Sequence, residues 1–358
     1  MQIIQEAKNG FRRLFGADFV ELRPLSATTA NLLAFLSLTE YEDTIMALKL
    51  ADGGHRSWNE GGVMEYVRGL RLRPLPFESE NMRVATDAAV KEIVEVKPRL
   101  IILGADIFLF PFPVKEIAEA ASQVGSTLMY DASMVLGLIG GGSFQNPLQE
   151  GAKVMTSTTA KTFSGPQGGV ILSSEEHSKT IEKVTAENVS NYHAQRIVAI
   201  AIALNEIEVF GAEYARQTML NARKLASSLF ERGLPVMCER TGFTQTHQVL
   251  LDCSSFGGAY NARQLLLQAN IIAAPCRIPN DDGTGQRNGL VVGTQEITRV
   301  GMREQEMADV SRFIEDALTQ KKTSEEIRMA VKEFRKPFQN IHYSFDEGDA
   351  YRYFESIS

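Results

Sequence analysis

Residues 154–169 of the chain read V-M-T-S-T-T-A-K-T-F-S-G-P-Q-G-G. The stretch starts as an apolar strand, continues through four hydroxyl-bearing residues at positions 156–159, and then reaches Lys161. Two turn signals, Gly165-Pro166 and Gly168-Gly169, then return the chain to a second apolar run. A lysine near a strand end, beside hydroxyls suited to a phosphate or a phenolic oxygen, indicates a ligand site rather than a solvated surface charge.

Short apolar runs alternate with amphipathic stretches over the first half of the chain. The runs that we predict to be buried strands are Thr44–Leu50, Leu100–Leu103, Ser126–Tyr130, Val154–Thr156 and Gly169–Leu172. Helical periodicity lies between them, at Asn31–Ser37, Thr86–Val96 and Val114–Val124. Strands that alternate with helices predict βαβ units and a largely parallel sheet, which is the α/β class.

The second half of the chain has a different order of elements. We predict long helices over 178–233, a strand at His247–Asp252, a helix at Asn261–Ala269 and a charged helical stretch at Arg303–Phe334. The chain therefore divides into a large domain with its connecting helices, residues 1–235, and a smaller α+β C-terminal domain, residues 236–358.

The composition argues against several classes of protein. The formal net charge is −7 and no basic run is present, so nothing indicates nucleic-acid binding. The three cysteines lack CxxC spacing and the five histidines are dispersed, so no metal site is predicted. No apolar stretch is long enough to span a bilayer, and the N-terminus lacks a signal-peptide core. We expect a cytoplasmic protein that does not bind membranes.

Asp131 closes the apolar run that begins at Leu128. An ionised carboxylate at a strand end suits a pyridine cofactor, because it keeps the ring nitrogen protonated and the ring electron-withdrawing. The residues alone also allow a simpler interpretation, in which Asp131 caps a helix or forms a turn.

The run from Tyr130 to Leu172 resembles the serine hydroxymethyltransferase family, whose members are fold-type I enzymes that depend on pyridoxal 5'-phosphate (PLP). The lysine segment of that family reads V-V-T-T-T-T-H-K-T-L-x-G-P-R-G-G, which residues 154–169 match at most positions. The resemblance implies a mainly parallel seven-stranded sheet between helices. It also implies that Lys161 holds PLP as a Schiff base and that Asp131 is the partner of the pyridinium nitrogen.

Segments upstream fit the same family register. Residues 24–31 read P-L-S-A-T-T-A-N, similar to the family's P-x-S-G-S-Q-A-N. The resemblance makes Ser26, Ala27 and Thr28 phosphate contacts at a helix N-terminus, and Asn31 a cofactor or substrate contact. Without it, Ser26 is simply a helix N-cap.

Two further cofactor contacts complete the predicted site. Gly53-Gly54-His55 matches the family's G-G-H, which implies that His55 stacks on the PLP ring and takes part in catalysis. Thr158, one of the hydroxyl-bearing residues before Lys161, is also predicted to contact the cofactor.

The chain departs from the family both beside the cofactor and where the substrate carboxylate is recognised. The family histidines after the aspartate and before the lysine are Met134 and Ala160 here, and the family's substrate-carboxylate arginine falls at Val291. Arg299 is our candidate for that carboxylate, with Arg277 and Arg287 also in the region.

Other departures concern folate and a neighbouring chain. Pro275-Cys276-Arg277 replaces an Asn-rich stretch, which argues against tetrahydrofolate as a co-substrate. The family's leading segment, with a catalytic glutamate and tyrosines, has no counterpart, so a partner chain is one source of those groups. The resemblance implies a homodimer, although Asn188 and Val189 replace two glycines of the family's cross-subunit contact.

Three functions stay open at this point. The first is hydroxymethyl transfer or aldol-type cleavage on a small amino acid or related amine. The second is a PLP-dependent aminotransferase or lyase with a changed substrate. The third is a catalytically reduced PLP-fold subunit that needs a partner chain.

Overall fold

The computed structural model describes residues 2–279, 281, 287–346 and 348. The chain divides into two compact units, Met1–Ala212 and Glu213–Ser358, and the division falls within helix α8 (Ala194–Glu231). The domain boundary that we expect at residue 235 lies just beyond the end of this helix and stays a prediction. None of the described helices combines the length and the apolarity that a bilayer crossing requires.

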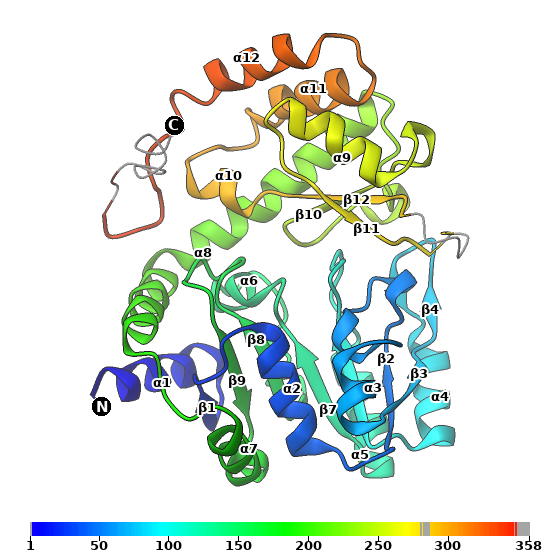
Figure 1. Ribbon diagram of the computed structural model, residues 1–358, viewed down its shortest axis with the longest axis vertical. Helices are drawn as coiled ribbons and strands as arrows, with labels where there is room; N and C mark the ends of the chain where they lie inside the picture. The colour runs from blue at the N-terminus through cyan, green and yellow to red at the C-terminus, as the bar shows by residue number, and fades with distance from the viewer. Residues whose placement is uncertain (1, 280, 282–286, 347, 349–358) are drawn as a thin grey trace. The chain divides into compact units, whose positions relative to one another are not determined.

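The first unit is built on a seven-stranded sheet (Figure 1). Its spatial order is β1 (Phe19–Glu21), β9 (Gly169–Ser173), β8 (Val154–Thr158), β7 (Thr127–Asp131), β6 (Leu100–Gly104), β2 (Thr44–Ala47) and β3 (Arg71–Pro74). The strands from β8 to β3 are parallel, whereas β9 runs antiparallel to both β8 and β1. The expected α/β class and mainly parallel seven-stranded sheet are thus confirmed.

Helices cover the sheet of the first unit. Helix α2 (Ala27–Leu38) packs on β8, β9 and α7 (Glu175–Asn188), while α4 (Thr86–Val96) packs on α5 (Val114–Val124). Every residue of β6, β8 and β9 is buried, as expected for inner strands of a sheet that is covered on both faces. The remaining elements are α1 (Gln2–Phe15), α3 (Val63–Arg68), β4 (Phe77–Glu78), β5 (Arg83–Val84) and α6 (Leu136–Gly140).

The strand expected at Thr44–Leu50 is too long. Strand β2 ends at Ala47, and Leu50–Asp52 forms the 3-10 turn η1, which Gly53 closes with φ +89°. The chain turns back so tightly that a Cβ on Gly54 would lie 2.0 Å from the Leu48 carbonyl oxygen. This turn brings His55 back to the carboxyl end of the sheet.

The second unit contains an antiparallel three-stranded sheet with the order β10 (Gln248–Asp252), β12 (Gly289–Gly293) and β11 (Ala274–Cys276). Its helices are α9 (Ala259–Gln268), α10 (Gln295–Arg299), α11 (Met307–Leu318) and α12 (Ser324–Phe334). The helical stretch expected at Arg303–Phe334 is two helices, because Thr323 forms a capping box with Glu326 and starts a new one. This unit has its own apolar core.

Candidate active site

The carboxyl ends of the parallel strands carry a group of polar residues that we call the strand-end cluster. It comprises His55 after β2, Asp106 after β6, Asp131 at the end of β7, and Thr158 and Lys161 at the end of β8. Because parallel strands end at one edge of the sheet, these residues share that edge, where α/β proteins bind ligands.

Asp131 is fixed by neighbours on three elements. Its Oδ2 accepts a hydrogen bond from Asn31 Nδ2 of α2 at 2.7 Å. Its Oδ1 accepts from the Ser133 backbone N–H at 2.9 Å and from the Ser133 hydroxyl. Thr156 of β8 donates to Asn31 Oδ1 at 2.6 Å, and Asn31, Asp131 and Thr156 are all buried. Such a set of donors holds the carboxylate in one orientation.

Lys161 lies on the loop that joins β8 to β9, with its side chain exposed and its Nζ 2.8 Å from Met134 Sδ. The Thr162 hydroxyl donates to the Met134 carbonyl at 3.1 Å, which ties the lysine loop to the segment after β7. A Cβ on Gly137 would lie 2.0 Å from the Thr162 carbonyl, so this contact requires glycine there. The other departure from the family, Ala160, is exposed beside Lys161.

The loop that carries Lys161 is also braced at its other end. The Thr158 hydroxyl donates to the Gly168 carbonyl at 3.0 Å, and the Thr159 hydroxyl donates to the Pro166 carbonyl at 2.6 Å. The predicted cofactor contact Thr158 is therefore buried with its hydroxyl directed to the backbone. These bonds hold the loop shape between the two turn signals.

The N-terminus of α2 lies at the same edge and carries the predicted phosphate contacts. Ser26 caps the helix, with its Oγ accepting from the Thr29 backbone N–H at 3.1 Å. The amides of Ala27 and Thr28 lie in the first turn, where backbone N–H groups lack partners within the helix and attract anions. Thr28 is exposed, and Ser26 and Ala27 are half-buried.

Arg196 of α8 supports this turn from within the first unit. Its Nη2 donates to the carbonyls of Leu22 and Arg23 at 2.7 and 3.2 Å, and its Nη1 donates to that of Pro24. Burial lowers the pKa of this guanidinium. Sequence reasoning missed Arg196, because the three carbonyls lie more than 170 residues away along the chain.

His55 is held in one tautomer by its own loop. Its Nδ1 accepts from the Ser57 backbone N–H at 3.1 Å and lies 2.7 Å from the Ser57 hydroxyl. The proton of the neutral ring is therefore on Nε2. The ring centroid is 5.3 Å from that of Trp58, and the His55 side chain is half-buried.

Asp106 is a member of the strand-end cluster that sequence reasoning missed. Burial raises the pKa of its carboxyl, His55 and Lys161 lower it, and Asp131 raises it. The signal was present in the sequence, because Asp106 follows the apolar run Leu100–Leu103 much as Asp131 closes its own run.

The candidates for a substrate carboxylate lie in the second unit. Arg299 ends α10, its Nη1 donates to the Tyr343 carbonyl at 2.8 Å, and its guanidinium carbon is 5.8 Å from the centre of the Tyr214 ring. Val291 pairs with Leu250 and Ala274 in the middle of the small sheet. Arg287 donates to the Pro275 carbonyl at 3.4 Å. The role assigned to Arg299 stays a prediction.

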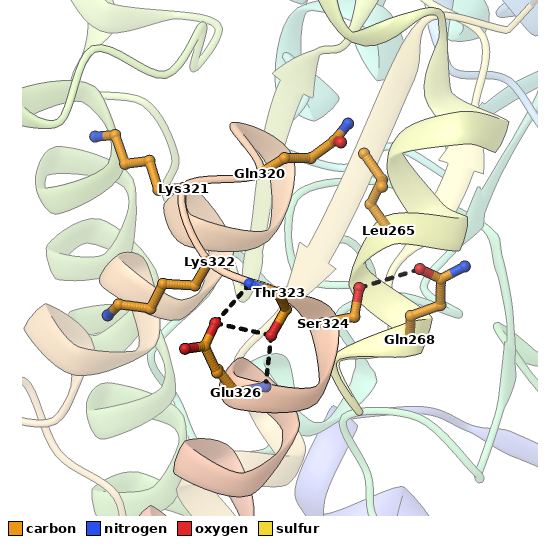
Figure 2. Close-up of a pocket in the computed structure, with 8 residues that line it drawn as sticks. All are labelled: Leu265, Gln268, Gln320, Lys321, Lys322, Thr323, Ser324 and Glu326. Carbon is orange, nitrogen blue, oxygen red and sulfur yellow. Dashed lines mark hydrogen bonds between the residues drawn. The ribbon is translucent and has the colours of Figure 1, made fainter.

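A hollow of about 420 Å³ belongs to the second unit, and none of its lining residues is part of the strand-end cluster (Figure 2). It lies at the start of α12, where Thr323 and Glu326 already satisfy the helix end. The two lysines that line it, Lys321 and Lys322, pair with Glu315 and Asp316. The two lysines and the N-terminus of α12 at this hollow therefore already have partners within the protein.

Comparison with known proteins identifies the family of the chain. A sequence model of serine hydroxymethyltransferase matches residues 2–314. The chain belongs to the serine hydroxymethyltransferase family. It is accordingly a PLP-dependent enzyme of the transferase or lyase type, as the motif around Lys161 predicts.

Individual relatives agree with this assignment. The chain is 44% identical over 347 residues to serine hydroxymethyltransferase of Methanothermobacter thermautotrophicus, covering 96% of this chain and 81% of the relative. It is 43% identical over 350 residues to serine hydroxymethyltransferase of Methanocaldococcus jannaschii, with coverage of 96% and 81%. The crystal structure of L-threonine transaldolase from Pseudomonas fluorescens, in its internal aldimine state, superposes with a TM-score of 0.90 at 29% identity. That match covers 99% of this chain and 81% of the transaldolase.

Proposed function

We propose that this chain holds PLP at the strand-end cluster and acts on a small amino acid or related amine by hydroxymethyl transfer or aldol-type cleavage. In this proposal Lys161 links the cofactor covalently, Asp131 faces the ring nitrogen and His55 stacks on the ring. Ser26 and the first-turn amides of α2 bind the phosphate. Asn31 acts through Asp131, and Thr158 shapes the lysine loop.

One observation carries this proposal. The carboxylate of Asp131, held by Asn31 and Ser133, ends the strand next to the one that leads to Lys161. An anion-binding helix end, a fixed carboxylate and an amine on one sheet edge fit the phosphate, the ring nitrogen and the aldehyde of PLP. When bound, PLP withdraws electrons and stabilises a carbanion on the substrate.

The chain's own residues orient the reacting groups and move protons. The network from Thr156 through Asn31 holds the Asp131 carboxylate in one position, which in this proposal is opposite the ring nitrogen. The Nζ of Lys161 is the amine placed to carry a proton to or from the substrate. The two relatives named serine hydroxymethyltransferase and the structure named L-threonine transaldolase support bond cleavage next to a β-hydroxyl group.

A second function is favoured by two specific residues. Met134 presents a thioether to Lys161 in place of a histidine, and Val291 stands at the position that the resemblance gives to an arginine. The first change lies beside the cofactor and the second at the predicted substrate-carboxylate position, which supports an aminotransferase or lyase with a changed substrate. Incubation with L-serine or L-threonine without tetrahydrofolate distinguishes the two, because aldol cleavage releases an aldehyde whereas the second function releases ammonia or transfers the amino group.

The experiment that tests PLP binding is a visible spectrum of the purified protein with and without added PLP. We expect the absorbance of lysine-linked PLP in the wild type and in Lys153→Ala, a variant at the opposite end of β8. We expect complete loss of that absorbance in Lys161→Ala. A wild type that shows no such absorbance would overturn the proposal, and bound PLP without any product would favour the catalytically reduced subunit.

We also propose a homodimer, with a partner chain as the alternative source of groups that lie outside the match. The chain spans 81% of the length of the archaeal relatives described above. Light scattering on the purified protein measures the mass of the particle. A mass of twice the chain supports the homodimer, and a monomeric mass contradicts it.

A further inference from the structure

Asp106 has no role in the proposal above, although the fold places it in the strand-end cluster. Its backbone N–H donates to the Gly53 carbonyl at 2.8 Å, two residues before His55. The Ile107 N–H donates to the same carbonyl at 3.3 Å. These bonds fix the end of β6 to the loop that carries His55.

The other neighbour of Asp106 is the end of β7. Gly104 pairs with Asp131 in the parallel register, and a Cβ on Gly104 would lie only 2.6 Å from the Cβ of Asp131. Two residues beyond this close approach, the chain reaches Asp106. Asp106 keeps an accessible surface, whereas both of its neighbours, Ala105 and Ile107, are buried; the protein around it still excludes enough water to raise the pKa of its carboxyl. The carboxylate therefore faces out at the sheet edge.

The charged groups that shift the pKa of Asp106 are His55, Lys161 and Asp131. His55 and Lys161 lower that pKa, and Asp131 raises it. Lys161 is the residue that we propose to hold PLP, so it is already engaged. His55 is already engaged at Nδ1, which accepts from the Ser57 backbone N–H.

We propose that Asp106 selects substrates by their charge. The site then prefers an amine that carries a neutral or cationic group at the position where an amino acid carries its carboxylate. A substrate carboxylate near Lys161 would meet Asp106, and like charges in a binding site weaken affinity by about tenfold or more. Val291, at the position where the resemblance predicts an arginine, also leaves the site without a positive charge that would bind a substrate carboxylate. This inference rests on the proposed function and specifies the substrate within it.

The test uses three amines that differ at one position. L-serine carries a carboxylate, ethanolamine carries hydrogen, and 2,3-diaminopropan-1-ol carries a cationic aminomethyl group at that position. Each is titrated into the PLP-loaded protein at about pH 8, where carboxyl groups are ordinarily ionised. The readout is the dissociation constant obtained from the absorbance change of lysine-linked PLP, and no turnover is needed.

We expect the wild type to bind ethanolamine and the diamine about tenfold or more tightly than L-serine. Asp106→Asn should reduce this preference by a similar factor, whereas Asp106→Glu should keep most of it. Asp87→Asn, in the first turn of α4, removes one exposed negative charge elsewhere in the same unit and should leave the preference unchanged. Asp106→Ser provides a second variant if Asp106→Asn does not load PLP.

Two results would overturn the inference. One is a wild type that binds L-serine at least as tightly as ethanolamine, and the other is a preference that Asp106→Asn leaves intact. In either case the wild type still shows lysine-linked PLP, so the proposed function stands. Failure of the proposed function is recognised separately, because the wild type then shows no such absorbance.

Discussion

Ser26 combines a structural and a proposed functional role in one side chain. Its Oγ caps α2 by accepting from the Thr29 N–H, and the same end of α2 is our phosphate site. We expect Ser26→Ala to lower the free energy of unfolding by about 1 kcal/mol, as for other lost N-caps. It should also weaken PLP binding, since a phosphate contact is removed.

The matched control is Thr323→Ala. Thr323 caps α12 in the second unit, with its Oγ1 accepting from the Glu326 N–H at 3.3 Å. Urea unfolding should show a similar loss of about 1 kcal/mol, while the dissociation constant for PLP stays unchanged. Equal effects of the two variants on PLP binding would contradict the phosphate role of Ser26.

Asp106 should also affect stability in a pH-dependent way. Burial raises the pKa of its carboxyl above the usual value, so the folded state binds this proton more tightly than the unfolded state does. Stability from this group is therefore present at low pH and is lost as pH rises through the unfolded and then the folded pKa. We expect Asp106→Asn to raise the urea midpoint of the PLP-free protein at neutral pH, with the gain disappearing near pH 3 to 4. A lower midpoint at neutral pH would mean that attraction to Lys161 and His55 outweighs burial.

Some of these residues could be predicted from the sequence and others could not. Lys161 and Asp131 stand at the ends of apolar runs, and that rule holds for any parallel sheet. The same rule applies to Asp106, although no motif marks this residue. Arg196 contacts carbonyls far away in the chain, so only the folded structure reveals its position.

At the scale of elements, the close packing of β6 against β7 depends on Gly104. A Cβ there would be 2.6 Å from the Cβ of Asp131, and neither atom belongs to the flexible end of a side chain. We expect Gly104→Ala to cost about 1 to 3 kcal/mol through overpacking and to weaken PLP binding by displacing Asp131. Urea unfolding and a PLP titration measure the two effects.

Gly142→Ala separates this steric effect from ordinary backbone strain. Gly142 has φ +66° and nothing within 4 Å of an added Cβ, so alanine there costs only the strain of a left-handed residue, about 1 to 2 kcal/mol. PLP binding should be unaffected. Normal PLP affinity in Gly104→Ala would show that Asp131 tolerates the displacement.

Element types were easier to predict than element ends. The strands at 100–104, 127–131 and 169–173 follow their apolar runs closely, because all of their residues except Thr127 are buried. Strand β2 ends early because the backbone turns at Gly53 and Gly54, an event that hydrophobicity does not record. The order of β10, β12 and β11 depends on pairing between distant segments, which local sequence cannot specify.

At the scale of the whole molecule, the proposed PLP contacts all belong to the first unit, and only the candidate Arg299 belongs to the second. A ligand that binds the folded state stabilises it by about 2.7 kcal/mol at a hundredfold excess over its dissociation constant. Local contacts also slow the opening of the segments that make them. We therefore expect PLP to slow amide hydrogen exchange most strongly in residues 24–31, 53–58, 104–106 and 156–169.

Hydrogen exchange measured by mass spectrometry on the full chain, with and without PLP, tests this division. Peptides from residues 213–340 should change much less than those four segments, and Lys161→Ala should abolish most of the protection. Addition of an amine substrate then gives a second comparison. New protection around residues 295–303 would support Arg299 as a substrate contact, since this segment contains α10. If PLP instead protects the second unit as strongly as the first, the cofactor site is not confined to the strand-end cluster and the helix end that we assign to it.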